Sequence, residues 1–209
     1  MSDQIIPTMA MPEVAAQVVA LTERLSPTDA RLNYVADLLK PMIGFAEEEG
    51  RNAFYAASRL LGTTPNNAKH IVGNVARRGS AEAFRAWRAG PCPLPVFEVP
   101  ALAPHLVGFV YFANPVSAPN VVKIGISPNL VRRMSDLEGE TGEEHVLQRW
   151  FVGTTLDEAV AQFALAGRRI SGKWFATGEP GGQIPGFIAM GVEGMRAALG
   201  PDLQKGRAA

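Results

Sequence analysis

The chain has 209 residues, of which 47% are hydrophobic and 19% are charged. This composition can bury a core and excludes an intrinsically disordered chain. Lys and Arg together number 20, as do Asp and Glu, so the formal net charge of zero excludes a uniformly basic protein. The single cysteine excludes an internal disulfide and fits a reducing compartment. The three histidines lie far apart, which argues against a zinc cluster.

Charge is distributed unevenly along the chain. Residues 1–49 carry three basic and eight acidic side chains, whereas residues 51–88 carry seven basic side chains and one acidic side chain. The basic segment suits an anionic partner, and nucleic acid is the first candidate. A solvated helical surface is the alternative that the charge pattern leaves open.

The sequence predicts a cytoplasmic protein with no membrane partner. The N-terminal stretch MSDQIIPTMAMPE lacks the basic start and the long apolar core of a signal peptide. No apolar run reaches the length that is needed to span a bilayer.

A proline-rich stretch predicts the domain boundary. Pro91–Pro104 contains five prolines in fourteen residues. Because proline removes a backbone donor and fixes φ, this stretch predicts a stiff extended linker. The expected organisation is a helical domain, a linker, a second domain and a short tail, over residues 1–90, 91–104, 105–200 and 201–209.

Residues 1–90 carry apolar side chains at helical spacing. The expected helices cover 12–25, 26–50, 51–61, 65–78 and 80–90. Ser26 and Asp29 predict that the second helix starts close to a capping box, and Pro41 should kink or split that helix. Gly90 is the expected C-terminal cap of the last helix.

The helices on either side of Gly62 resemble a helix-turn-helix. Gly62 would lie in the turn, while Ile71 and Val72 would pack the second helix against the first. An ordinary helical bundle fits the same pattern, and the basic excess favours DNA. On that interpretation, the start of the second helix and its basic end reach bases and phosphates. The candidate DNA-binding residues are Asn66, Asn67, Lys69, His70, Arg77 and Arg78.

The pattern changes after the linker to short strands and two-faced helices, which predicts an α+β fold. The expected strands cover residues 106–113, 120–127 and 145–153, and residues 172–180 should be extended. The expected helices cover 127–138, 154–170 and 183–200. Ser127 is the expected N-cap of the first of these helices, with Pro128 as its first residue.

Several short motifs follow one another over residues 107–177. Tyr111 lies in the strand motif VYF, KIG follows at Lys123–Gly125, and Arg133 lies eight residues after the glycine. Glu158 precedes Arg169, Gly172, Trp174 and Phe175. This order and spacing resemble the GIY-YIG endonuclease superfamily. The similarity is to its phage-associated branch, in which the second motif reads KIG and the C-terminal part reads roughly E..LH..F...R..GEWF.

The resemblance implies a small three-stranded antiparallel sheet flanked by helices and a metal-dependent DNA endonuclease. Glu158 would hold one divalent ion, Mg²⁺ or Mn²⁺, with waters completing its coordination shell. Arg133 would clamp the scissile phosphate, and Tyr111 would position or deprotonate the attacking water. Lys123 would either lower the pKa of Tyr111 or contact the phosphate.

Each matched residue also has a structural interpretation. Tyr111 fits a core aromatic in a strand, Glu158 fits the start of a helix, and Arg133 fits a helix surface. The joint spacing of the four residues favours the catalytic interpretation.

Two departures from the family pattern lie close to the expected site. Gln162 stands where the branch usually has histidine, and Lys173 replaces the glutamate of GEWF. These changes suggest an alternative function, which is a DNA-binding or regulatory protein whose nuclease fold is weak or inactive. A further alternative is a protein-interaction module in which the N-terminal helices form a homodimer surface.

Overall fold

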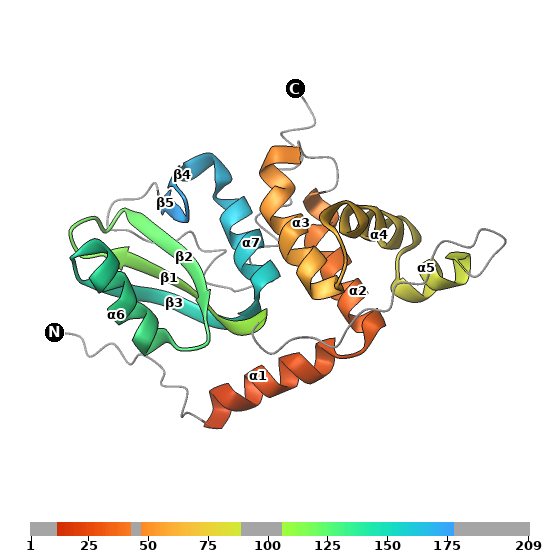
Figure 1. The fold of residues 1–209 in the computed structure, drawn as a ribbon, viewed down its shortest axis with the longest axis horizontal. Coiled ribbons are helices and arrows are strands. Elements are labelled where there is room, and N and C mark those ends of the chain that lie inside the picture. The colour runs from red at the N-terminus through yellow and green to blue at the C-terminus, as the bar shows by residue number, and fades with distance from the viewer. Residues whose placement is uncertain (1–11, 43–46, 89–105, 178–209) are drawn as a thin grey trace.

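The computed structural model describes residues 12–42, 47–88 and 106–177. The protein belongs to the α+β class, as predicted, with N-terminal helices followed by a five-stranded antiparallel sheet and interspersed helices (Figure 1). The predicted linker, the helix expected over 183–200, the tail and the cap expected at Gly90 fall outside the described residues. Within the described ranges, no helix has the length and apolar character that spanning a bilayer requires.

The N-terminal helices follow the predicted pattern closely. They are α1 (Pro12–Leu25), α2 (Thr28–Leu39), the 3-10 turn η1 (Lys40–Met42), α3 (Glu47–Leu61), α4 (Pro65–Arg78) and α5 (Ala81–Arg88). The expected break at Pro41 is confirmed, because α2 ends at Leu39 and a 3-10 turn follows. The capping box expected at Ser26 is wrong. Pro27 is the N-cap and makes no side-chain cap hydrogen bond, while Ser26 Oγ donates backwards to the Thr22 carbonyl.

The turn between α3 and α4 is stabilised at both of its ends. Gly62 has a φ of 61°, a conformation that favours glycine, and the Thr63 N–H donates to the Ser58 carbonyl at 2.9 Å. Thr64 caps α4 by accepting from the Asn67 N–H. Ile71 and Val72 are buried against the neighbouring helices, as predicted. The two helices and the glycine turn between them are therefore formed, and the helix-turn-helix with its use in DNA binding stays a prediction.

The sheet contains the three predicted strands and two short ones. The strands are β1 (Val107–Pro115), β2 (Val121–Ser127), β3 (His145–Thr154), β4 (Arg169–Ser171) and β5 (Trp174–Ala176), arranged in the order β3-β1-β2-β5-β4. The expectation of three strands is therefore corrected to five. β4 and β5 have only three residues each, too few to give an alternating pattern in the sequence. β4 takes up residues that had been expected to end a helix.

β1 is buried along its whole length because both faces of the sheet are covered. Val110 and Phe112 belong to the main core with the N-terminal helices, whereas Phe109 and Tyr111 pack on the opposite face against α6 (Leu130–Thr141). This double burial explains the unbroken apolar run around Tyr111. The expected N-cap at Ser127 is wrong, since Ser127 ends β2 and the side chain of Asn129 caps α6.

Helix α7 (Thr155–Ala164) lies between the sheet and α3 (Figure 1). Every residue from Leu156 to Gln162 is buried, as expected for a helix that is covered on several sides. At its start, Thr154 and Asp157 form a capping box, and the Tyr34 hydroxyl of α2 donates to Asp157 Oδ2. The N-terminal helices and the sheet therefore share one core, which includes residues from both halves of the chain.

We predict that Gly125→Ala destabilises the fold. Gly125 pairs with Tyr111 across β1 and β2, and an added Cβ would lie 2.7 Å from Tyr111 Cε1 and closer still to the ring carbon bearing the hydroxyl. Such overpacking costs roughly 1–3 kcal/mol, which urea unfolding would measure. Gly139→Ala is the matched control, because nothing lies within 4 Å of its added Cβ. Equal stabilities of the two variants would contradict this account of Gly125.

Candidate functional site

Tyr111 and Arg133 meet on the face of the sheet that α6 covers. The Arg133 Nε donates a 2.9 Å hydrogen bond to the Tyr111 hydroxyl. Arg133 reaches the hydroxyl because α6 begins at Leu130, so its first turn lies beside the middle of β1. Burial raises the pKa of Tyr111, while the hydrogen bond and positive charge of Arg133 oppose that rise. Arg133 is therefore the cation that contacts the Tyr111 hydroxyl, and a role of Lys123 in lowering the pKa of Tyr111 stays a prediction.

Arg133 also forms an ion pair that the sequence analysis missed. Its guanidinium donates to both carboxylate oxygens of Glu140, with distances of 2.8 Å and 3.3 Å. This pairing lowers the pKa of Glu140 and raises that of Arg133. The two residues are seven apart and so lie on one face of α6, a spacing that could have indicated the pair.

Lys123 lies on the same side of the sheet as Tyr111. Its ammonium is 4.7 Å from the centroid of the Trp174 ring, a cation–π contact that holds the lysine across β2 and β5. Burial lowers the pKa of Lys123, and the positive charge of Arg133 lowers it further. Arg133 thus places a positive charge at the Tyr111 hydroxyl, and Lys123 lies within range of the charge of Arg133 on the same side of the sheet.

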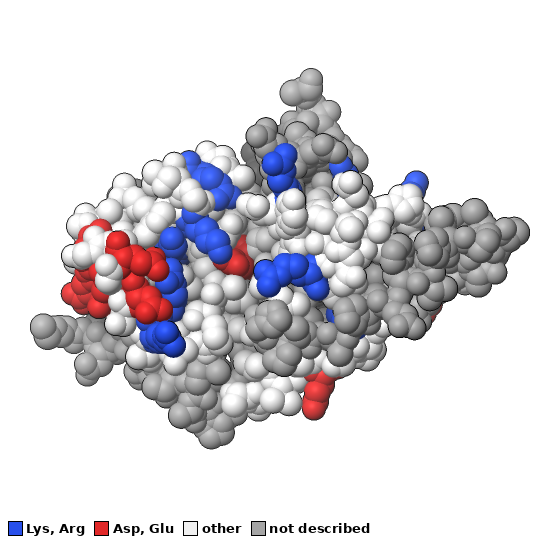
Figure 2. Space-filling view, viewed as in Figure 1, with Lys and Arg blue, Asp and Glu red and all other residues white. Residues whose placement is uncertain are grey.

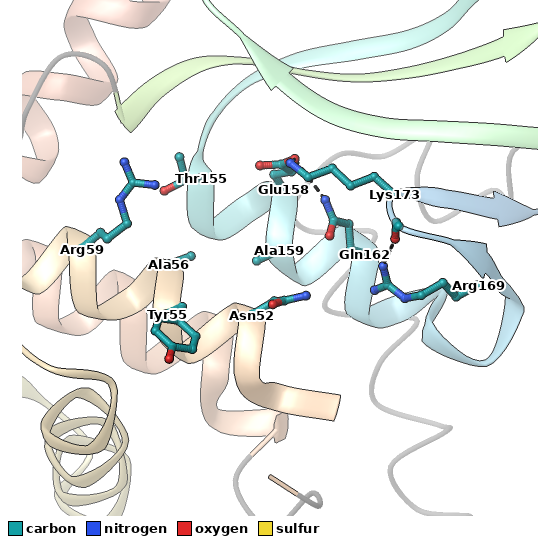
Figure 3. A pocket seen from close by; sticks show the side chains of 11 residues that line it. Asn52, Tyr55, Ala56, Arg59, Thr155, Glu158, Ala159, Gln162, Arg169 and Lys173 are labelled. Atoms are coloured by element: carbon teal, nitrogen blue, oxygen red, sulfur yellow. Dashed lines mark hydrogen bonds and ion pairs between the residues drawn. The ribbon is translucent and has the colours of Figure 1, made fainter. Parts of the chain in front are cut away.

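Glu158 lies near the start of α7, where it is held by the two residues that depart from the family pattern. The Lys173 ammonium lies 2.5 Å from Glu158 Oε1, and Gln162 donates to the same oxygen at 3.0 Å (Figure 3). The Glu158 side chain is 8% exposed, so this pairing compensates a carboxylate that is largely removed from water. The sequence identified both departures without indicating that they share one partner.

The matched residues therefore form two neighbouring groups. Tyr111, Arg133 and Lys123 make up one group, and Glu158 with Lys173 makes up the other. Among the described residues, Glu158 makes its direct contacts with Gln162 and Lys173. Its charge nevertheless contributes to the raised pKa of Tyr111 and opposes the lowering of the Lys123 pKa. The backbone N–H of Ile124, next to Lys123, donates to the Lys173 carbonyl at 3.1 Å, so the two groups lie in one region of the sheet.

The Glu158 carboxylate fits a single divalent ion. Oε1 receives both hydrogen bonds, whereas no described residue donates to Oε2, which leaves one hard oxygen ligand of the kind that Mg²⁺ prefers. In the part of the chain that the structure describes, no three His, Cys, Asp or Glu side chains group into a metal cluster. An ion at this position would thus depend on Glu158 and water, and the Lys173 ammonium would compete with it.

Four of the six candidate DNA-binding residues share a groove on α4. Asn66, Lys69, His70 and Arg77 line a cleft of about 720 Å³ together with Lys40 of η1. The groove brings basic side chains from two elements together, as phosphate binding requires.

Asn67 and Arg78, the other two candidates, do not line this groove. The backbone N–H of Asn67 donates to the cap of α4, and Arg78 donates to the buried Asn74 side chain at 2.9 Å. Both residues therefore contribute to the structure of α4, and their contact with DNA stays a prediction.

We predict that Tyr111 ionises above its ordinary pKa of about 10. Ultraviolet titration at the phenolate band, comparing the wild type with Tyr111→Phe, would isolate this tyrosine. Arg133→Ala should move the Tyr111 midpoint still higher, because it removes the cation and the hydrogen bond that favour the phenolate. Arg132→Ala, one residue earlier on α6, is the control. A Tyr111 midpoint that falls in Arg133→Ala would contradict the assigned contact.

Comparison with known proteins gave no match to this chain. No family model, no curated protein and no solved structure is similar to it. The resemblance to the GIY-YIG superfamily therefore depends on the matched residues themselves, of which Tyr111, Lys123, Arg133 and Glu158 are the ones that carry chemistry.

Proposed function

We propose that the chain is a metal-dependent DNA endonuclease that hydrolyses phosphodiester bonds. The observation that carries this proposal is the 2.9 Å hydrogen bond between Arg133 and the Tyr111 hydroxyl. Lys123 lies on the same side of the sheet. A guanidinium next to a phenol can bind a phosphate oxygen and hold a water beside it. The basic groove on α4 would add affinity for DNA outside the site of cleavage.

Arg133 would bind the scissile phosphate by exchanging one anion for another. Its present partner, the Glu140 side chain, is 53% exposed, so the loss of this pair costs little. The Nε of Arg133 would keep its bond to Tyr111 while the two terminal nitrogens turn to the phosphate oxygens. Lys123 would add a second positive charge, which stabilises the negative charge that develops on those oxygens.

Tyr111 would position the attacking water. Because burial raises its pKa, the neutral phenol is the resting form at neutral pH, and its O–H is free to donate to a water. The water oxygen attacks phosphorus and the bond to the leaving oxygen breaks. The proton that the attacking water loses passes to solvent, and the leaving oxygen takes up a proton from solvent. A divalent ion held by Glu158 would supply positive charge at that oxygen.

A second candidate function is DNA binding without efficient cleavage. The observation that favours it is the 2.5 Å ion pair between Lys173 and Glu158, since this pair places a fixed cation where the ion would bind. On this alternative, the chain would be a DNA-binding or regulatory protein on a GIY-YIG-like fold.

We predict metal-dependent nicking of supercoiled plasmid by the wild type. Tyr111→Phe, Arg133→Ala and Glu158→Ala should each reduce the rate, by about 10²–10³-fold if each removes one stabilising contact in the transition state. Arg132→Ala should nick like the wild type, because this exposed neighbour does not reach Tyr111. Cleavage that survives all three substitutions would rule out the site. DNA binding without nicking by the wild type would favour the second candidate.

We predict that Lys173→Met strengthens the binding of Mn²⁺, used as a spectroscopic substitute for Mg²⁺. Removal of the ammonium frees Glu158 Oε1 and eliminates a repulsive charge, so the dissociation constant should fall roughly tenfold. Electron paramagnetic resonance would measure free Mn²⁺ without any need for activity. Lys173→Arg, which keeps the charge, is the control. Unchanged affinity in Lys173→Met would show that the ion does not bind at Glu158.

A further inference from the structure

A cleft separates α3 from the part of the site that contains Glu158. It has a volume of about 580 Å³. Asn52, Tyr55 and Arg59 of α3 line one wall, and Glu158, Arg169 and Lys173 lie across from them (Figure 3). This volume lies within the range of roughly 300–1,000 Å³ that is typical of small-ligand pockets, and it accommodates a ligand of about the size of one nucleotide. The N-terminal helices therefore provide one wall of the proposed site.

The charge of this cleft favours an anionic occupant. Its lining includes three cations, Arg59, Arg169 and Lys173, and one anion, Glu158. The view in Figure 2 shows basic side chains on both sides of the hollow between α7 and α3. A phosphate entering the cleft would be attracted from both walls.

The side chains of α3 are free to contact such an occupant. Arg59 is exposed, and its guanidinium has no hydrogen bond or ion pair with any described residue. Tyr55 is 54% exposed, an unusual position for a large aromatic ring. An exposed aromatic next to cations is the combination on which single-stranded nucleic acids stack their bases.

The side of the site that α6 covers is unfavourable for a polyanion. Figure 2 shows acidic side chains gathered over α6, on the far side of the basic side chains from α3. This acidic surface includes Asp136, Glu138 and Glu140. Repulsion from these carboxylates would direct a nucleic-acid strand away from α6 and towards the cleft.

We propose that the cleft between α3 and α7 binds a single strand of DNA, with one phosphate at Arg59, a neighbouring phosphate at Arg169 at the other end of the cleft, and a base on Tyr55. This inference deepens the proposed function, on which it rests, by assigning single-stranded or unpaired DNA as the substrate class. α3 then determines the preference of the site for single-stranded over duplex DNA, in addition to any contribution from the groove on α4. The Lys173–Glu158 pair lies across the cleft from α3, so a bound strand would lie beside the proposed metal ligand.

Fluorescence anisotropy with a labelled oligothymidylate tests this proposal. Arg59→Gln and Tyr55→Ala should each weaken binding about tenfold, whereas Arg51→Gln on the same helix, outside the cleft, should not. Arg59→Gln should also reduce the salt dependence by about 0.7 in the log–log slope, as expected for one lost contact with a single strand. Circular dichroism would verify that these surface variants stay folded.

A labelled duplex of the same length separates the substrate classes. The proposal expects the α3 variants to affect binding of the single strand much more than binding of the duplex. Equal losses of affinity in Arg59→Gln and Arg51→Gln would overturn the single-strand proposal, and so would equal losses for the single strand and the duplex. A wild-type protein that does not bind the single strand would also overturn it. Plasmid nicking is measured separately from strand binding. Nicking that does not depend on Arg59 or Tyr55 would contradict only the role of α3. Binding of the single strand without nicking would contradict only the proposed nuclease activity.

Discussion

The burial of α7 between the sheet and the N-terminal helices is the constraint on which the rest of the structure depends. Seven consecutive residues of this helix are buried, so its position is fixed by packing on several sides. The Tyr34 hydroxyl joins the capping box of Thr154 and Asp157, which connects the start of α7 to α2. Glu158 follows Asp157 directly, and its carboxylate is therefore placed by the core.

The same packing places α3 beside the proposed site. Because α7 contacts α3 on one side and the sheet on the other, the helical half of the chain provides a wall for the cleft that contains Glu158 and Lys173. The two halves are joined by a shared core. A substitution in α3 can therefore alter access to the site without touching the sheet.

The parts of the structure that local patterns determine could be predicted from the sequence. The break at Pro41, the turn at Gly62 and the three longer strands follow from residues that lie close together in the chain. The structure brings together Tyr111 and Arg133, two residues that the family resemblance matched, and their catalytic roles stay predictions. The α+β class followed from the change of periodicity after the proline-rich stretch.

Other features depend on contacts between residues far apart in the sequence. No local pattern indicates that Tyr34 would reach Asp157, or that Arg59 would face Lys173 across a cleft. The caps expected at Ser26 and Ser127 were wrong because neighbouring residues, Pro27 and Asn129, take these positions. β4 and β5 are too short to recognise in the sequence. β5 pairs with the edge of β2, and β4 pairs in turn with β5.

A double-mutant cycle tests most directly whether Tyr111 and Glu158 belong to one centre for phosphodiester cleavage. Single-turnover cleavage of labelled DNA would be compared for Tyr111→Phe, Glu158→Ala and the double variant. Residues that serve one step are strongly non-additive, so we predict that the double variant is no slower than the slower single variant. Losses that multiply in the double variant would show two independent effects and contradict the account.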